Sequence, residues 1–222
     1  MLSLDTNRKF RGNDVVIVGG GGLALMLIDA INGIREYNII GILDDYAEQG
    51  SLVYGYTVLG KIDEELSKLY EHGLRLAVNA IGGMVNNQED PLFTARVMVA
   101  DKIRSYGFII PNIIHPRAIV EPTAKMGDGN IVLAGANIGS KVVIEDDCYI
   151  NTNSMVSHEC HIGRGVRIAP GAILAGRIKV GENSLIGMGV TIYMNAKVGK
   201  NSIVYNGVNV YKSVPNNKII TE

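Results

Sequence analysis

Few side chains in this 222-residue sequence could carry proton-transfer or nucleophilic chemistry near neutral pH. They are the histidines His72, His115, His158 and His161 and the cysteines Cys148 and Cys160. Histidine is the side chain whose ordinary pKa lies nearest to neutrality, so it is the first candidate for a general base. The most informative histidine is His158, in the segment Ser157-His158-Glu159-Cys160, because the spacing around it also predicts where it points.

The elements that must position these residues begin with a repeat in the C-terminal half. Every sixth residue from Ile114 to Val210 is Ile, Val, Leu or Met. The residues two places before them are mostly small: Ala118, Ala124, Ala136, Cys148, Ser154, Cys160, Ala172, Ser184, Ala196 and Ser202. A period of six fits neither an amphipathic helix nor an unbroken strand. It predicts short strand-and-turn units that each send one aliphatic side chain inward and stack into a parallel β-solenoid.

The repeat also predicts the orientation of the reactive side chains. Cys148 and Cys160 fall on the small inward positions, so we expect packed, unreactive thiols; an acyl-cysteine intermediate would need an exposed thiol with a low pKa. His158 lies outside both inward positions and should point outward. For His161, directly before an inward position, we expect a surface or interface role.

The N-terminal half alternates predicted strands and helices. The apolar runs that predict strands cover residues 14–18, 38–43 and 75–81. Helical patterns follow the first run and also cover 61–72 and 92–106, and residues 108–113 look extended. Such alternation predicts a parallel sheet in a small α/β, Rossmann-like unit.

Four consecutive glycines, Gly19–Gly22, follow the first predicted strand and precede a helix. Their spacing to Ala24 matches the dinucleotide fingerprint, and the acids Asp44 and Asp45 follow about 20 residues later. Glycines let the backbone approach a phosphate, whose charge the helix N-terminus favours. Because this half is too short for both halves of a dinucleotide fold, it favours some other nucleotide-linked ligand. The alternatives are NAD(P) and a tight turn with nothing bound.

The glycine-rich half, the Asp44-Asp45 pair, the His115-Pro116 connector and the six-residue repeat together resemble one family. The sequence is similar, nearly throughout, to bacterial nucleotide-sugar acetyltransferases of the sialic-acid O-acetyltransferase type. The resemblance implies a nucleotide-sugar-binding domain over residues 1–112 and a left-handed β-helix over 113–222, with three hexapeptides per triangular coil. It also implies acetyl-CoA as co-substrate, no metal, and a homotrimer.

The resemblance assigns the chemistry to the His-Glu-Cys segment. It implies that His158 is the general base and that Glu159 supports it. With three hexapeptides per coil, Gly176 stacks beside His158, leaving room for a thioester and offering an N–H to the acetyl oxygen. Where the family commonly has a second histidine, nine residues after the base, this sequence has Arg167, which stays protonated and could bind a phosphate or carboxylate.

The resemblance also implies two sets of ligand contacts. Acetyl-CoA is expected between neighbouring subunits, at Arg167, Gly176, Gly187, Met188, Ala196 and Lys197, with Lys200 and Lys212 as further candidates for its phosphates. The nucleotide-sugar is expected at Gly19, Gly20, Gly21, Gly22, Leu23, Asp44, Asp45 and Gly82. The family's Gly-Gly-His-Ala motif here has Leu23 in place of its histidine.

Composition excludes several classes of protein. The formal net charge is -1, so there is no basic excess for binding nucleic acid or an anionic membrane. No apolar run approaches the roughly 18 residues of a membrane span, and the first residues do not resemble a signal peptide. Two cysteines are too few for a disulfide scaffold and fit a reducing cytoplasm.

We therefore predict a cytoplasmic acetyl-CoA-dependent N-acetyltransferase. Its acceptor would be the amine of a nucleotide-linked amino sugar of the 4-amino-4,6-dideoxyhexose type, made for a surface glycan. The alternatives are a sugar O-acetyltransferase, transfer of another acyl group and a non-catalytic nucleotide-sugar-binding protein. A zinc carbonic anhydrase on this repeat would need three clustered histidines, but His72 lies in the other half and His115 lies more than two coils from His158.

Overall fold

The computed structural model describes residues 9–82 and 92–222, which divide into two compact units. Of the described residues, 9–82 and 98–111 belong to the first unit, and 92–97 and 112–222 belong to the second. The predicted boundary between residues 112 and 113 lies next to the observed one. The sequence did not predict that residues 92–97 belong with the second unit.

The first unit is a five-stranded sheet with helices, in the strand order β3-β4-β2-β1-β5. Its strands are β1 (Asp14–Val18), β2 (Asn38–Leu43), β3 (Leu52–Val53), β4 (Tyr56–Gly60) and β5 (Leu76–Asn79). The helices are α1 (Gly22–Ile34), α2 (Ile62–Glu71) and α3 (Leu92–Ser105), of which α3 runs on from the second unit. Strands β1, β2, β4 and β5 are parallel, whereas β3 pairs with β4 as a short antiparallel hairpin.

Burial on both sides explains why the central strand β1 is purely apolar after its first residue. Val16 and Val18 pack in one cluster with Leu66 of α2 and Ile103 of α3. Val15 and Ile17 point to the opposite face, because side chains alternate along a strand, and they are equally buried. A parallel sheet covered on both faces has continuous apolar strands of this kind. The predicted strands and helices are confirmed, but the β3–β4 hairpin was missed.

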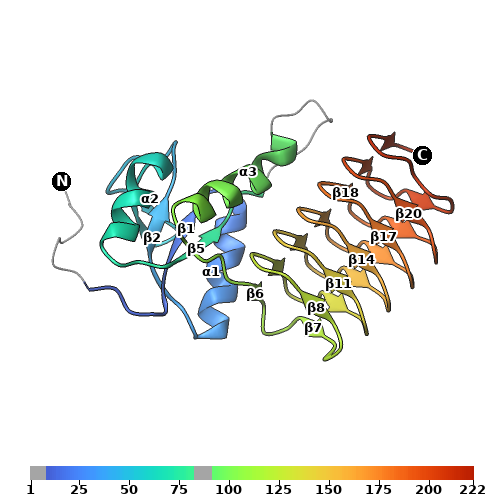
Figure 1. The fold of residues 1–222 in the computed structure, drawn as a ribbon, viewed down its shortest axis with the longest axis horizontal. Coiled ribbons are helices and arrows are strands. Elements are labelled where there is room, and N and C mark those ends of the chain that lie inside the picture. The colour runs from blue at the N-terminus through green and yellow to red at the C-terminus, as the bar shows by residue number, and fades with distance from the viewer. Residues whose placement is uncertain (1–8, 83–91) are drawn as a thin grey trace. The chain divides into compact units, whose positions relative to one another are not determined.

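The second unit is a left-handed β-helix with three sheets of two-residue strands, stacked coil upon coil from β6 to β23 (Figure 1). Sheet I contains β6 (Ile113–Ile114), β9 (Ile131–Val132), β12 (Tyr149–Ile150), β15 (Arg167–Ile168), β18 (Leu185–Ile186), β21 (Ile203–Val204) and β23 (Ile219–Ile220). Sheet II contains β7 (Ile119–Val120), β10 (Asn137–Ile138), β13 (Met155–Val156), β16 (Ile173–Leu174), β19 (Thr191–Ile192) and β22 (Asn209–Val210). Sheet III contains β8 (Lys125–Met126), β11 (Val143–Ile144), β14 (His161–Ile162), β17 (Lys179–Val180) and β20 (Lys197–Val198).

The strand register confirms the coil length that the resemblance implied. Neighbouring strands pair in parallel with partners 18 residues apart, as His161 pairs with Lys179 and Lys179 with Lys197. The second residue of each central strand fills the interior; Ile150 and Val156, for example, are fully buried. The small residues two places earlier point inward as well, so the six-residue pattern describes the interior of the β-helix correctly.

The last coil departs from this spacing. Ile203 pairs with Ile219, so the partners there are only 16 residues apart, and Val198 bridges Val214 at the same shortened spacing. The segment from Val210 to Val214 is therefore two residues shorter than the corresponding segment of a regular coil. The aliphatic pattern in the sequence ends at the same place.

A pair of neighbouring residues tests the inward-and-outward pattern. Ile144 is 1% exposed, whereas Val143 on the same strand is 37% exposed. We expect Ile144→Ala to lower the free energy of unfolding by about 2–5 kcal/mol, because it leaves a cavity in the interior. The matched control Val143→Ala should change it by no more than about 0.5 kcal/mol. Urea unfolding followed by circular dichroism measures both; equal losses would contradict the assigned orientation.

Candidate active site

His158 lies in the turn between β13 and β14, at the edge where sheets II and III meet. Its side chain is 45% exposed, as expected for an outward position. The ring Nδ1 lies 3.0 Å from Oε2 of Glu159, the next residue. Glu159 has a φ of 58°, a left-handed backbone conformation that turns its carboxylate back towards the histidine ring. The two side chains therefore form a histidine–carboxylate pair on the surface.

Gly176 lies one coil further along the same edge and directly faces the histidine ring. A Cβ atom at this position would lie 2.5 Å from Nε2 of His158 and 2.6 Å from Cε1. No side chain can occupy that space while the ring keeps its place. The predicted stacking of Gly176 beside His158 is thus present in the structure, and it demands glycine for steric reasons.

The N–H of Gly176 is a hydrogen-bond donor with no acceptor in the described part of the chain. At equivalent places in other hexapeptides this N–H points outward and finds a side-chain oxygen. Examples are Asp128 donating to Asp146 at 2.8 Å, Arg164 to Glu145 at 3.0 Å and Met188 to Asn206 at 2.8 Å. The Gly176 N–H is therefore oriented to donate to an oxygen atom supplied from outside.

The charge of Glu159 is stabilised by its neighbours. The hydrogen bond with His158, followed by the positive charge of Arg177, lowers the pKa of Glu159 below its ordinary value. Nε of Arg177 lies 3.2 Å from the same Oε2 atom. At neutral pH the carboxylate is ionised, so it accepts a hydrogen bond from the histidine and does not donate one.

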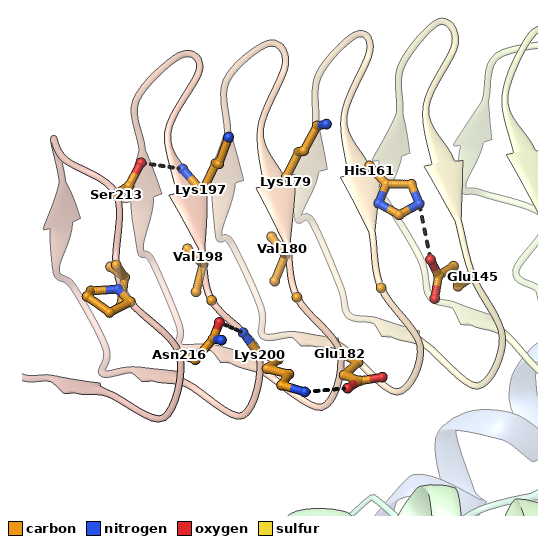
Figure 2. A pocket seen from close by; sticks show the side chains of 15 residues that line it. Glu145, His161, Lys179, Val180, Glu182, Lys197, Val198, Lys200, Ser213 and Asn216 are labelled. Carbon is orange, nitrogen blue, oxygen red and sulfur yellow. Dashed lines mark hydrogen bonds and ion pairs between the residues drawn. The ribbon is translucent and has the colours of Figure 1, made fainter.

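A groove of about 580 Å³ runs along the outer surface of sheet III, as Figure 2 shows. His161 lies in it with Nε2 3.1 Å from Oε1 of Glu145, so a carboxylate holds this second histidine ring. Lys179 and Lys197 lie in register on adjacent strands, and neither ammonium group has an acceptor in the described residues. Two like charges directly opposite each other destabilise a sheet. The groove therefore favours an anionic ligand.

Four residues expected to contact CoA do not gather around His158 on the same chain. Gly187 and Met188 lie after β18, at the edge between sheets I and II. Ala196 is 6% exposed and its side chain faces the interior, and its contact with CoA stays a prediction. The fourth residue, Arg167, lies on sheet I.

Arg167 is 4% exposed, and its contact with CoA stays a prediction. The beginning of α3 lies on this side of the β-helix. Arg96 donates there to the carbonyl oxygens of Asp147 at 2.9 Å and Gly129 at 3.0 Å. An outward position in the repeat can thus be covered by chain from elsewhere, which the six-residue period does not reveal.

Both cysteines are packed in the interior, as predicted. Cys148 Sγ donates to the carbonyl oxygen of Gly163 at 3.1 Å, and Cys160 Sγ donates to that of Ala175 at 3.1 Å. Burial raises the pKa of Cys148 to about 12 and also raises the pKa of Cys160. Neither thiol is an activated nucleophile.

In the first unit, the predicted nucleotide-sugar residues meet at the carboxyl ends of β1, β2 and β5. Gly19 has a φ of 101°, and a Cβ there would lie 2.8 Å from Ile81, so this turn needs glycine. The N–H of Gly20 donates to Oδ2 of Asp44 at 2.6 Å. A side chain at Gly21 or Gly22 would meet no atom within 4 Å, which leaves open space before the N-terminus of α1.

Asp44 and Asp45 each accept hydrogen bonds from backbone N–H groups of the first unit. Burial raises the pKa of Asp44, but hydrogen bonds from the backbone of Tyr46, Gly20 and Ala47 outweigh it and lower the pKa below its ordinary value. Oδ1 of Asp45 accepts from the N–H of Ile62 at 3.0 Å, at the beginning of α2. Both carboxylates therefore stabilise the local backbone by accepting hydrogen bonds from it.

Leu23 is 8% exposed, and its contact with the substrate stays a prediction. It lies on the buried face of α1 with Ala24 and Leu27. A Cβ atom built on Gly82, another predicted contact, would lie 3.4 Å from Cβ of Leu23. Gly82 thus lies beside the first turn of α1.

Two contributors to the site were missed by sequence reasoning. Arg177 lies one coil after Glu159, and Lys179 lies one coil after His161. Both could have been found by adding one coil to a residue already chosen, as was done for Gly176.

Two features are absent from the described residues. No group of three or more His, Cys, Asp or Glu side chains there is arranged to hold a metal ion. No helix among residues 9–82 and 92–222 is both long and apolar enough to cross a membrane.

Comparison with known proteins agrees with this arrangement. The PglD N-terminal domain model matches residues 14–89, and the bacterial transferase hexapeptide model, of six repeats, matches residues 141–176. Perosamine N-acetyltransferase from Caulobacter crescentus, solved with CoA and GDP-perosamine as a histidine-to-asparagine variant, is 32% identical. That alignment has a TM-score of 0.85 and covers 94% of this chain and 93% of that one.

Two further relatives extend the comparison. The acetyltransferase domain of PglB from Neisseria gonorrhoeae, solved with acetyl coenzyme A, is 28% identical, with a TM-score of 0.83 over 94% of this chain and 96% of that chain. GDP-perosamine N-acetyltransferase of Escherichia coli O157:H7 is 31% identical over 91 residues, which is 41% of this chain and 41% of that protein. The match thus spans less than half the length of that curated relative.

The fold and the site define a hexapeptide-repeat acyltransferase with an N-terminal α/β domain. The chain belongs to the family of nucleotide-sugar acetyltransferases that includes the Caulobacter perosamine enzyme. None of these three relatives is a sialic-acid O-acetyltransferase, so that narrower resemblance stays a prediction.

The burial of both thiols predicts their reactivity. We expect Cys148 and Cys160 to resist a thiol reagent such as 5,5′-dithiobis(2-nitrobenzoate) in the folded protein, because each is buried and its pKa is raised. In guanidinium chloride both should react within minutes. Rapid labelling of either thiol in the native protein would contradict the assignment and restore an acyl-cysteine as a candidate intermediate.

Proposed function

We propose that the protein transfers the acetyl group of acetyl-CoA to the amino group of a nucleotide-linked amino sugar. The observation that carries the proposal is the histidine–carboxylate pair of His158 and Glu159, with Nε2 of the histidine facing the bare backbone of Gly176. The relatives with CoA, acetyl coenzyme A and GDP-perosamine in their solved structures support the two substrates.

His158 serves as the general base in this proposal. The carboxylate of Glu159 accepts the Nδ1–H, which leaves Nε2 unprotonated and free to take a proton. As the amine nitrogen attacks the thioester carbon, Nε2 takes a proton from the amine. When the C–S bond breaks, the imidazolium returns that proton to the CoA thiolate, so the enzyme ends as it began.

Gly176 stabilises the oxyanion that forms during the attack. Its N–H is unoccupied among the described residues and points outward, as the equivalent N–H groups do when they bind side-chain oxygens. Removal of one preorganised donor of this kind typically costs 10²–10³ in kcat. The absence of a side chain also leaves space for the thioester beside Nε2.

The groove on sheet III supports a position for the phosphates of CoA. Lys197 and Lys200, both expected from the sequence, are joined there by Lys179. The ammonium group of Lys200 already lies 3.6 Å from the carboxylate of Glu182. Lys179 and Lys197 lie in the coils that follow His161, on the C-terminal side of the base. Two adjacent unpaired ammonium groups suit a phosphate or diphosphate better than a neutral ligand.

The nucleotide-sugar is assigned to the glycine turn of the first unit. The open space at Gly21 and Gly22 precedes the N-terminus of α1, where backbone N–H groups favour a phosphate. Asp45 accepts one hydrogen bond through Oδ1, and its Oδ2 has no donor in the described part of the chain. Asp45 therefore suits a hydrogen-bond donor of the nucleotide better than Asp44, which accepts three backbone N–H groups.

The proposal includes a homotrimer in the cytoplasm that serves surface glycan synthesis. Gly187 and Met188 lie at a different edge from Gly176, so one CoA molecule contacting both would do so between two copies of the chain. Ile119, Met155 and Ile173 are exposed on sheet II between these edges, which suits burial against a second copy.

The first experiment measures CoA-thiol release from acetyl-CoA with a panel of UDP-, dTDP- and GDP-linked 4-amino sugars. We expect release with one amino sugar and a fall in kcat by at least about 10² in His158→Ala, because the general base is lost. The matched control His72→Ala, an exposed histidine of the first unit, should retain full activity.

Each other outcome assigns the chemistry elsewhere. Undiminished release in His158→Ala would contradict its role as base, and loss in His161→Ala alone would transfer that role to His161. No release with any amino sugar, but release with hydroxyl acceptors, would replace N-acetylation by O-acetylation. If no acceptor and no acyl donor gives release of CoA thiol, the result would favour a non-catalytic nucleotide-sugar-binding protein.

The position of the CoA phosphates is tested by comparing two acetyl donors. Acetyl-pantetheine lacks every phosphate of acetyl-CoA. The double variant Lys179→Met/Lys197→Met should raise the KM for acetyl-CoA roughly tenfold, because charge-assisted hydrogen bonds are lost. It should leave the KM for acetyl-pantetheine unchanged. Lys125→Met, an outward lysine on the same sheet but outside the groove, is the matched control. An equal rise for both donors would contradict phosphate binding here.

A further inference from the structure

We propose that Arg177 is a positioning residue for the general base and acts on His158 through Glu159. The inference rests on the proposed role of His158, and it adds a residue that the sequence analysis did not assign. Arg177 does not contact the reacting atoms in this proposal. It fixes the carboxylate that in turn fixes the histidine ring.

Two contacts join Arg177 to the histidine–carboxylate pair, and a third lies within the pair. Its backbone N–H donates to the carbonyl oxygen of His158 at 2.9 Å. Its side-chain Nε–H donates to Oε2 of Glu159 at 3.2 Å. His158 Nδ1 lies 3.0 Å from that same Oε2 atom. One carboxylate oxygen therefore joins the arginine to the histidine.

The repeat explains why these groups meet. Glu159 and Arg177 occupy the same turn position in successive coils, and both have left-handed backbones, with φ of 58° and 60°. Their side chains consequently leave the turn in the same direction, one coil apart. Lys141 and Asn195 occupy this position in the coils on either side, also with positive φ. Among the residues at this turn position, Arg177 is the cation that forms an ion pair with Glu159.

The contact differs from an ordinary surface ion pair on the same β-helix. The pair of Lys200 and Glu182, at 3.6 Å, joins two half-exposed side chains and no third group. The side chain of Glu159 is also 42% exposed. Contact with solvent does not restrict such a side chain to one rotamer. The second donor on Oε2 restricts the carboxylate to the position from which it meets Nδ1. The lowered pKa of Glu159, due first to His158 and then to Arg177, agrees with a shared ionised carboxylate.

The consequence concerns the tautomer of His158. A neutral histidine carries its proton on either Nδ1 or Nε2, and the hydrogen bond made by one nitrogen decides the form of the other. With Glu159 held in place, the proton stays on Nδ1 and the lone pair stays on Nε2, which faces Gly176. Without Arg177, the carboxylate can rotate into solvent and the fraction of rings with an unprotonated Nε2 falls.

Steady-state kinetics tests the effect on catalysis. Arg177→Met should lower kcat roughly two- to five-fold, the size that an exposed ion pair supports, with the KM values of both substrates unchanged. Arg177→Lys, which restores a cation, should recover part of the loss. The matched control Arg117→Met removes an exposed arginine of the same β-helix and should change neither constant. In a Glu159→Ala background, Arg177→Met should have no further effect, because the residue through which it acts is absent.

A measurement without substrates separates this inference from the proposed function. The ¹⁵N chemical shifts of the His158 ring report the tautomer directly. We expect the Nδ1–H form to dominate in the wild type and to lose population in both Arg177→Met and Glu159→Ala. An unchanged tautomer in Arg177→Met, or an additive loss of kcat in the double variant, would overturn the positioning role. An inactive wild type with the expected tautomer shift would contradict the proposed reaction and leave the positioning intact.

Discussion

The in-register stacking of successive coils is the constraint on which the rest of the second unit depends. Parallel backbone hydrogen bonds hold each residue beside the residue one coil away, as between the N–H of Arg177 and the carbonyl oxygen of His158 at 2.9 Å. The stack therefore fixes the neighbours of the candidate base through main-chain bonds. The steric demand at Gly176 and the contact between Glu159 and Arg177 follow from the same spacing. A loop with fewer backbone bonds would hold these groups less firmly.

The same regularity decides what could be predicted from the sequence. The period of six correctly identified the interior of the β-helix, the buried thiols of Cys148 and Cys160 and the outward direction of His158. The family's coil length added the neighbour Gly176. These successes share a cause: each depends on position within a repeat whose backbone bonds are local and periodic.

The sequence reveals less where another segment of the chain decides the environment of a residue. Arg167 occupies an outward position in the repeat but is buried. Leu23 was assigned by alignment with a family motif, yet the periodicity of α1 turns its side chain inward. Asp44, predicted to contact the nucleotide-sugar, also accepts hydrogen bonds from three backbone N–H groups. A motif specifies residue types, but burial and competing donors depend on the folded chain.

The shortened last coil has a consequence for association between molecules. A stack of parallel strands ends in unpaired N–H and C=O groups, and a flat end could template another chain and grow into a fibre. Here the pairing of Ile203 with Ile219 skips two residues, so the final turn does not repeat the outline of the coil beneath it. Exposed polar residues, Lys212, Asn216 and Lys218, lie on this turn. The irregular spacing thus interrupts the 18-residue repeat in the last coil of the described β-helix.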